Sequence, residues 1–273
     1  MLKVKNRITE LAGDMVPIFA DPNREYCYLS RVQRYRRIPG GARFSVLTND
    51  DQEMTLDIRF VSTYVVRVRC YRPGREPPLD SPMLVEGALR TAEVRVEAVE
   101  GKIIIRSDVL ELRVVRRPFH YGVFDFTGRK LFVQQIGDVS DLGLVSLPMG
   151  YARDANGRIA FHESFELQPD EHLFSLEQQR GPVDRRGQRI VVWSDDGIGT
   201  NTTNVTHHNT PFFWSSCGYG VFAHHSTRTT WELGSPSTVT GSFSVEDAYL
   251  DYFLIFGGSP KHILARHAEL SSK

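Results

Sequence analysis

The sequence has few cysteines and no metal-binding motif among them. Cys27, Cys70 and Cys217 are the only three in 273 residues, and their spacing matches neither a disulfide framework nor a zinc ligand set. The adjacent histidines at 207–208 and 224–225 would point to opposite faces of an extended strand, so each pair offers at most one ligand per side. We therefore predict reduced thiols, no metal site and no cofactor.

The chain also lacks an excess of charge of either sign and a long apolar run. Lys and Arg total 33, as do Asp and Glu, so no net field attracts nucleic acid or an anionic membrane. No apolar stretch approaches the roughly 20 residues that span a bilayer. Residues 1–7 lack the apolar segment of a signal peptide. We predict a cytoplasmic protein with no nucleic-acid partner and no membrane partner.

What the sequence does contain is an alternation of apolar and polar residues with a period of two. Residues 64–70 place Val66, Val68 and Cys70 on one face, and Arg67 and Arg69 on the other. This alternation is typical of antiparallel strands with one solvated face. Similar segments recur from residue 42 to residue 256, separated by short turns that contain glycine. The pattern predicts an all-β chain built as a large sandwich or barrel.

One helix is predicted, near the end of the chain. Ser259 can serve as its N-cap, and Pro260 then occupies the first helical position, where its missing N–H costs nothing. Ile263, Leu264 and His267 share one face at helical spacing. We predict a β-domain over residues 1–258, followed by a helix over residues 259–273.

Several motifs in the second half of the chain follow the order of motifs in glycoside hydrolase family 31. Residues 161–167 (F-H-E-S-F-E-L) together with residues 170–176 resemble the family pattern F-x-L-x-x-x-E-x-x-Y-G-L-G-E. The further matches are residues 193–197 (W-S-D-D-G), 211–213 (P-F-F), 218–221 (G-Y-G-V), 250–253 (L-D-Y-F) and 257–264 (G-G-S-P-K-H-I-L). The family's G-L-G-E is S-L-E-Q here, at residues 175–178, and differs at both glycines and at the glutamate.

The resemblance implies an all-β fold, a galactose-mutarotase-like supersandwich of mostly antiparallel strands with one C-terminal helix. It also implies the N-terminal, non-catalytic domain of a retaining α-glycosidase that acts on α-glucosides or α-xylosides. The two catalytic aspartates of that family lie on a following (β/α)8 barrel. The implied partners are the barrel and an α-linked carbohydrate.

No catalytic residue is predicted in this chain. Retaining hydrolysis needs two carboxyl groups about 5 Å apart across the sugar, whereas the adjacent Asp195 and Asp196 would point to opposite faces if extended. The resemblance instead implies that the loop holding Asp196 shapes the sugar pocket. Asp195, Thr200 and Trp193 are further substrate-binding candidates on or beside that loop. We predict that the isolated chain is inactive on α-glycosides.

The side of the domain that would face the barrel is predicted to be apolar and exposed. The candidates for this surface are Phe256, Ile263 and Leu264, with Trp193 or Trp214 beside them. A contiguous exposed apolar patch recruits a partner or aggregates. A homo-oligomer is therefore an expected state of the isolated chain.

Two other functions remain open at this point. A stand-alone carbohydrate-binding module could use the surface of the same sandwich. An aldose 1-epimerase would need a histidine acid and a glutamate base that converge in one cleft. The candidate pairs, His162 with Glu163 and His172 with Glu171, are sequence neighbours, which argues against the epimerase.

Overall fold

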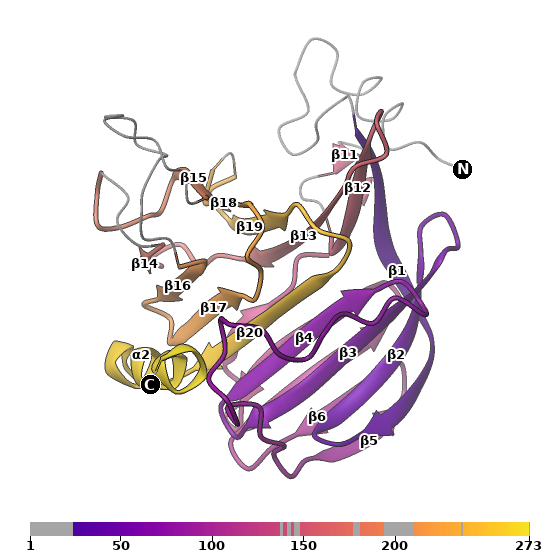
Figure 1. Cartoon of the computed structure of the whole chain (residues 1–273). Coiled ribbons are helices and arrows are strands. Elements are labelled where there is room, and N and C mark those ends of the chain that lie inside the picture. The colour runs from indigo at the N-terminus through magenta and orange to yellow at the C-terminus, as the bar shows by residue number, and fades with distance from the viewer. Residues whose placement is uncertain are drawn as a thin grey trace.

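The computed structural model describes residues 24–136, 139–140, 143–144, 148–176, 181–193, 210–235 and 237–272. Most of the regular structure in these residues is β-strand, arranged mainly in two large sheets (Figure 1). Every strand pair in them is antiparallel. The predicted all-β, mostly antiparallel sandwich with a C-terminal helix is confirmed.

The larger sheet has 13 strands and the smaller has five. In spatial order the larger sheet consists of β14 (Leu173–Ser175), β16 (Phe212–Ser215), β17 (Tyr219–Ala223), β20 (Leu250–Phe256), β4 (Val65–Tyr71), β3 (Glu53–Ser62), β2 (Gly41–Thr48), β1 (Arg24–Ile38), β12 (Gly150–Asp154), β13 (Ile159–Glu166), β19 (Thr240–Val245), β18 (Thr229–Leu233) and β15 (Gln188–Val192). The smaller sheet consists of β5 (Arg95–Val99), β6 (Lys102–Arg106), β7 (Leu110–Arg116), β8 (Phe119–Asp125) and β9 (Lys130–Val133). The strands β10 (Val139–Ser140) and β11 (Gly143–Leu144) pair with each other.

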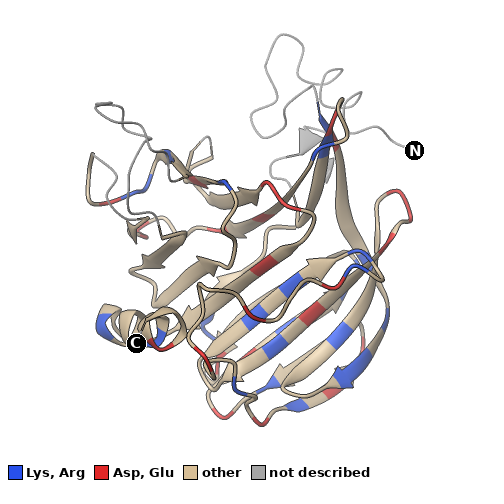
Figure 2. Ribbon diagram, viewed as in Figure 1, with Lys and Arg blue, Asp and Glu red and all other residues tan. Residues whose placement is uncertain are grey.

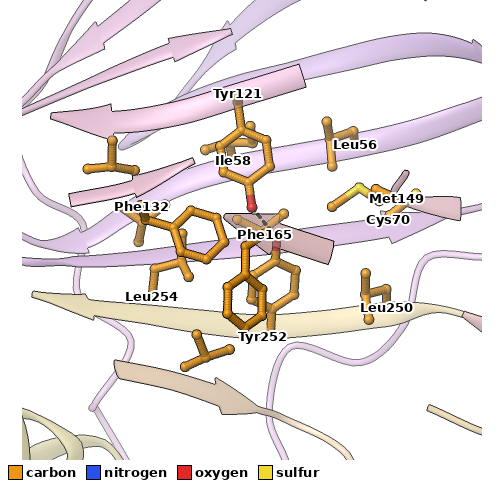
Figure 3. Packing of buried hydrophobic residues seen from close by; sticks show 14 of the residues in the cluster. Leu56, Ile58, Cys70, Tyr121, Phe132, Met149, Phe165, Leu250, Tyr252 and Leu254 are labelled. Carbon is orange, nitrogen blue, oxygen red and sulfur yellow. Dashed lines mark hydrogen bonds between the residues drawn. The ribbon is translucent and has the colours of Figure 1, made fainter. Parts of the chain in front are cut away.

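The hydrophobic core fills the space between the two large sheets. On β4 the side chains of Val66, Val68 and Cys70 are fully buried in it, as the alternation predicts. At its centre Tyr121 of β8 and Tyr252 of β20 point toward each other and their hydroxyl groups form a hydrogen bond (Figure 3). The two sheets are thus joined by a polar contact as well as by apolar packing.

The opposite face of β4 is not solvated, contrary to the prediction. Arg67 and Arg69 are only 3% and 1% exposed. Residues 72–94, here called the strap, run across this face of the large sheet (Figure 1). The guanidinium of Arg67 donates to the carbonyl of Leu79 at 2.9 Å, and that of Arg69 donates to the carbonyl of Pro77. The alternation gave the correct faces, but a loop from the same chain covers the polar one.

Charges alternate across four neighbouring strands on this covered face. Arg43 of β2 is the register partner of Asp57 of β3, which pairs with Arg69 of β4, which pairs in turn with Asp251 of β20. Arg43 donates two hydrogen bonds to Asp57, each 2.6 Å long. Bands of both charges cross these strands in Figure 2. A one-residue slip of any strand would move its charge into the core, so this row of charges reinforces the register.

The predicted helix is present as α2 (Pro260–Ser271), and Ser259 caps it by accepting a hydrogen bond from the backbone N–H of His262. The helix lies against the large sheet near β16, β17 and β20 (Figure 1). Its buried residues, Ile263 and Leu270, pack with Phe212, Phe222 and other apolar residues of the outer face. Within the described residues, no helix is long and apolar enough to cross a membrane.

The predicted exposed apolar surface is wrong for two of its members. Ile263 is 0% exposed because α2 folds back onto the sheet, whereas Phe256, at 1% exposed, belongs to the main hydrophobic core. Trp214 is half-buried and stacks on another aromatic ring of the neighbouring strand. Only Leu264 and Trp193, at 45% and 46% exposed, remain open to solvent.

Candidate functional site

The segment just before β15 joins the two edges of the large sheet. The backbone N–H of Arg185 donates to the carbonyl of Leu173 in β14 at 2.7 Å. The Arg185 guanidinium also donates to the carbonyl of Ser175 at 3.0 Å. On the inner face, Phe213 of β16 meets Trp231 of β18 edge-on, with ring centroids 5.6 Å apart. The large sheet therefore curls so that its two edge strands, β14 and β15, both lie beside residues 181–187. This segment is here called the seam.

The predicted sugar-binding loop has both of its described ends near the seam. It follows β15 at Trp193, and the described chain resumes at Thr210, just before β16. Asp195, Asp196 and Thr200 lie outside the described residues, so their assignment stays a prediction. Trp193 is 46% exposed at the end of an edge strand, where its ring is available to a ligand.

Trp214, the tryptophan nearest the far end of this loop, is engaged within the chain. Trp214 on β16 stacks on Phe174 of β14, with ring centroids 4.3 Å apart and planes inclined by 25°. Of the remaining aromatic residues near the loop, Phe212, Phe213 and Trp231 are at most 2% exposed. They pack inside the fold, as the alternation predicts, which leaves Trp193 as the accessible aromatic candidate among the described residues of this region.

A buried carboxylate lines a hollow at the edge of β9 and β17. Glu171 is 1% exposed, and its Oε1 accepts hydrogen bonds from Ser215 Oγ at 2.5 Å and Tyr219 Oη at 2.6 Å. Burial, followed by the charge of Glu171, raises the pKa of Tyr219 well above its usual value. The hollow beside them has a volume of about 320 Å³ and is also lined by Lys130 and Cys217. The two hydroxyl donors hold the Glu171 carboxylate in place. It therefore fastens the loop before β14 to β16 and β17.

A second buried carboxylate, Glu163 of β13, lies inside the sandwich. Tyr252 Oη donates to its Oε2 at 2.7 Å, and Gln134 Nε2 lies 3.0 and 3.1 Å from its two oxygens. Burial raises the pKa of Glu163 to about 7, and the hydrogen bonds from Tyr252, Gln134 and the Ser164 N–H offset only part of that effect. The glutamate is fully buried, which suits a stabilising role better than contact with a ligand.

Neither histidine–glutamate pair forms the arrangement that an epimerase needs. His162 lies beside Tyr26, and burial lowers its pKa to about 4. Glu163, its neighbour on β13, makes its hydrogen bonds inside the sandwich instead. His172 pairs with Asp184 at 2.6 Å, away from the hydroxyl partners of Glu171. The four residues therefore do not converge in a cleft.

The described residues contain no group of three or more His, Cys, Asp or Glu side chains that could hold a metal ion. The three cysteines are free thiols. Cys27 lines another hollow, of about 440 Å³, together with Asp50, Glu53, Arg72 and Arg153. Burial raises the pKa of the Cys27 thiol, so it is less nucleophilic than an ordinary surface cysteine.

Comparison with protein families gives a match over most of the chain. Residues 55–232 match the model of the glycosyl hydrolase 31 N-terminal galactose mutarotase-like domain. The matched segment begins within β3 and ends within β18, so it includes the seam and the candidate loop.

Curated relatives of known activity share parts of this region. The chain is 40% identical to an α-xylosidase of Emericella nidulans over 108 residues, which is 40% of this chain and 14% of the relative. It is 35% identical to the α-xylosidase XylQ of Lactiplantibacillus pentosus over 109 residues, again 14% of the relative. Over 222 residues it is 22% identical to α-glucosidase 2 of Bacillus thermoamyloliquefaciens, covering 79% of this chain and 26% of that enzyme. The chain thus spans about a seventh of each α-xylosidase and about a quarter of the α-glucosidase.

Solved structures share the fold at low identity. The cycloalternan-forming enzyme of Listeria monocytogenes, in complex with a pentasaccharide substrate, aligns with 90% of this chain at a TM-score of 0.76 and 16% identity. This chain covers 22% of that structure. The GH31 dextranase of Flavobacterium johnsoniae in complex with glucose aligns with 90% of this chain at a TM-score of 0.71 and 24% identity, and 28% of the dextranase is covered.

Proposed function

Because the chain belongs to the family of glycosyl hydrolase 31 N-terminal galactose mutarotase-like domains, we propose that it is the non-catalytic N-terminal domain of a retaining α-glycosidase. The substrates of the complete enzyme are α-xylosides or α-glucosides. The observation that carries this proposal is the family match over residues 55–232, joined to the 40% identity with an α-xylosidase. The absence of a converging His–Glu pair at the two positions considered argues against the epimerase.

In this proposal the chemistry belongs to a (β/α)8 barrel that follows the β-domain. Residues 1–258 form the supporting sandwich, and residues 259–273 lead toward the barrel. The docking of α2 on the large sheet supports this arrangement, because a helix fixed by Ile263 and Leu270 sets the direction in which the chain continues. The three free thiols suit the cytoplasm as the place where this enzyme works.

The loop after Trp193 would shape the sugar pocket at the barrel mouth. A carboxylate such as Asp196 accepts hydrogen bonds from sugar hydroxyls, and its charge roughly doubles their strength. Asp195 and Thr200 supply further polar groups on the same loop, and Trp193 supplies an apolar ring face. Support for this role comes from the seam, whose hydrogen bonds to β14 hold the chain just before β15. The loop starts where β15 ends, so the seam also restrains the start of the loop.

The test is a chimera in which this chain replaces the corresponding N-terminal region of the Emericella nidulans α-xylosidase. We expect the chimera to hydrolyse an aryl α-xyloside, and the 273-residue chain alone to hydrolyse none. Asp196→Asn in the chimera should lower kcat/KM about tenfold to a hundredfold, because a hydrogen bond to a charged group contributes about 1.5–3 kcal/mol.

The matched control is Asp108→Asn, which makes the same chemical change in an exposed turn between β6 and β7. It should leave kcat/KM unchanged. A folded chimera without activity on any aryl α-glycoside would contradict the proposed domain role. Equal kcat/KM for the Asp196→Asn and Asp108→Asn chimeras would contradict the role of the loop alone. Tight binding of free oligosaccharide by the isolated chain would favour the stand-alone binding module instead.

A further inference from the structure

A serine, a histidine and an aspartate form a connected row between the strap and the large sheet. Ser81 Oγ on the strap lies 2.6 Å from His224 Nε2, directly after β17. His224 Nδ1 lies 3.1 Å from Asp251 Oδ2 on β20. His224 and Asp251 are 5% and 0% exposed, whereas Ser81 is half-buried. Ser81 is thus the most accessible member of a row whose other two members are shielded.

Two groups face His224 Nδ1: Asp251 Oδ2, which only accepts, at 3.1 Å, and an Arg67 nitrogen, which only donates, at 3.3 Å. We assign the imidazole hydrogen to Nδ1 on the shorter of these contacts, so Nε2 presents its lone pair to Ser81. The backbone N–H of Met83 donates to Ser81 Oγ at 3.1 Å, which directs the hydroxyl hydrogen toward His224. This is the arrangement in which a histidine withdraws the proton of a serine.

Asp251 is held rigidly in its ionised form. Arg67 donates to its two oxygens at 2.9 and 2.6 Å, and the Asp251 backbone N–H donates to His225 Nε2 at 2.9 Å. Burial by itself raises the pKa of Asp251, but the hydrogen bonds from Arg67 and His224 outweigh it and hold the pKa at about 2. The carboxylate therefore orients the imidazole across the whole neutral range.

A serine activated by a single histidine attacks most readily a substrate whose leaving group departs easily. The chemistry of the cluster therefore suits aryl esters of short carboxylic acids and similarly activated acyl or phosphonyl compounds.

We propose that Ser81 is a nucleophile that takes an acyl group from small activated esters, with His224 as its general base and Asp251 as the residue that positions His224. In the first step Ser81 Oγ forms a bond to the carbonyl carbon, its proton passes to His224 Nε2, and the bond to the aryl oxygen breaks. The departing phenolate takes the proton. A water molecule then attacks the acyl carbon while His224 Nε2 accepts its proton. The bond to Ser81 Oγ breaks, His224 returns the proton to that oxygen, and the carboxylic acid departs. This activity is independent of the proposed glycosidase role.

The chain offers an internal control for the experiment. Ser259 Oγ lies 3.2 Å from His262 Nδ1 at the exposed start of α2, and within the described residues this pair has no carboxylate behind it. The 273-residue chain is treated with a fluorophosphonate, in which Ser81 displaces fluoride from phosphorus, and labelled serines are identified by mass spectrometry of peptides. We expect labelling at Ser81 to exceed that at Ser259 at least about tenfold.

Variants separate the nucleophile from its base. Ser81→Ala should abolish the label at that site, and His224→Gln should slow labelling of Ser81 about a hundredfold, the lower end of what a positioned general base contributes. Circular dichroism and urea unfolding report whether each variant is folded. Hydrolysis of p-nitrophenyl acetate by the unaltered chain, lost in Ser81→Ala, provides a second measurement. Labelling of Ser81 no faster than that of Ser259, or unchanged labelling in a folded His224→Gln variant, would mean that the row only fastens the strap, and would overturn the proposal.

Discussion

The buried glutamate Glu163 gives the chain a dependence of stability on pH that one substitution can isolate. Its pKa is about 7 in the folded chain, against an ordinary value of 4.5. Between these pH values the unfolded chain has released the proton and the folded chain still holds it, so stability falls as pH rises through this window. At about 1.36 kcal/mol for each pKa unit, the loss amounts to roughly 3 kcal/mol and is complete above pH 7.

Other groups mask this loss in the unaltered chain. Burial lowers the pKa of His162 and of His267 to about 4, so the folded chain releases their protons where the unfolded chain still binds them. Their contribution to stability is present above pH 6.5 and is lost as pH falls toward 4. It has the opposite sign to that of Glu163 over much of the same range. The contributions of His162 and His267 are the same in the unaltered chain and in Glu163→Gln. The difference in stability between the two proteins therefore isolates the contribution of Glu163.

The assay is urea unfolding of both proteins at pH 5 and pH 8. At pH 5 we expect Glu163→Gln to be less stable, because an amide cannot accept all the hydrogen bonds that Gln134, Ser164 and Tyr252 donate. At pH 8 the variant should gain roughly 3 kcal/mol relative to the unaltered chain, since it buries no charge. The control is Glu93→Gln, which makes the same change at an exposed position. Parallel pH dependence for Glu163→Gln and the unaltered chain would refute the reasoning.

Three further predictions follow from the packing of the large sheet and of α2. Asp57→Asn should lower the free energy of unfolding by about 1.5–3 kcal/mol in urea titrations, because it removes the buried charge with which Arg43 and Arg59 pair, while Asp108→Asn should change it little. Ile263→Ala should cost about 2–4 kcal/mol, since the side chain is fully buried; a cost below about 0.5 kcal/mol would mean that α2 is not docked. If the chain self-associates through its exposed apolar residues, Leu264→Glu should shift its sedimentation toward the monomer, and an unchanged distribution would exclude this residue from the contact.

Local sequence patterns predicted most strands because side-chain alternation depends only on the chain itself. The alternating segment at residues 64–70 became β4, Val65–Tyr71, within one residue at each end. The longest described strand, β1, was missed, because it lies before residue 42, where the recognised alternation begins. Its register against β2 shifts between Leu29 and Arg31 and again between Val32 and Arg34. Each shift changes which residues face inward, so no single period runs along the strand and the alternation cannot be recognised.

What the sequence could not predict was what covers each face. Arg67 and Arg69 were assigned to the correct side of β4, but their burial depends on the strap, and the alternation along β4 does not show what covers that side. The helix was located from its cap and its proline, whereas its docking surface depends on Phe212 and Phe222, which lie on other strands. Local pattern therefore determined the elements, and contacts between distant segments determined which of them are exposed.

The same distinction separates the two candidate sites. The loop after Trp193 was found from motif order alone, because the family's motifs are continuous in sequence. The row formed by Ser81, His224 and Asp251 has no such signal, since its members are separated by 143 and 27 positions. Only the pairing of β17 with β20, together with the path of the strap across them, brings the three side chains into hydrogen-bond contact. A cluster of this kind is recognised from the geometry and the roles of its residues, because the order of motifs along the chain does not reveal it.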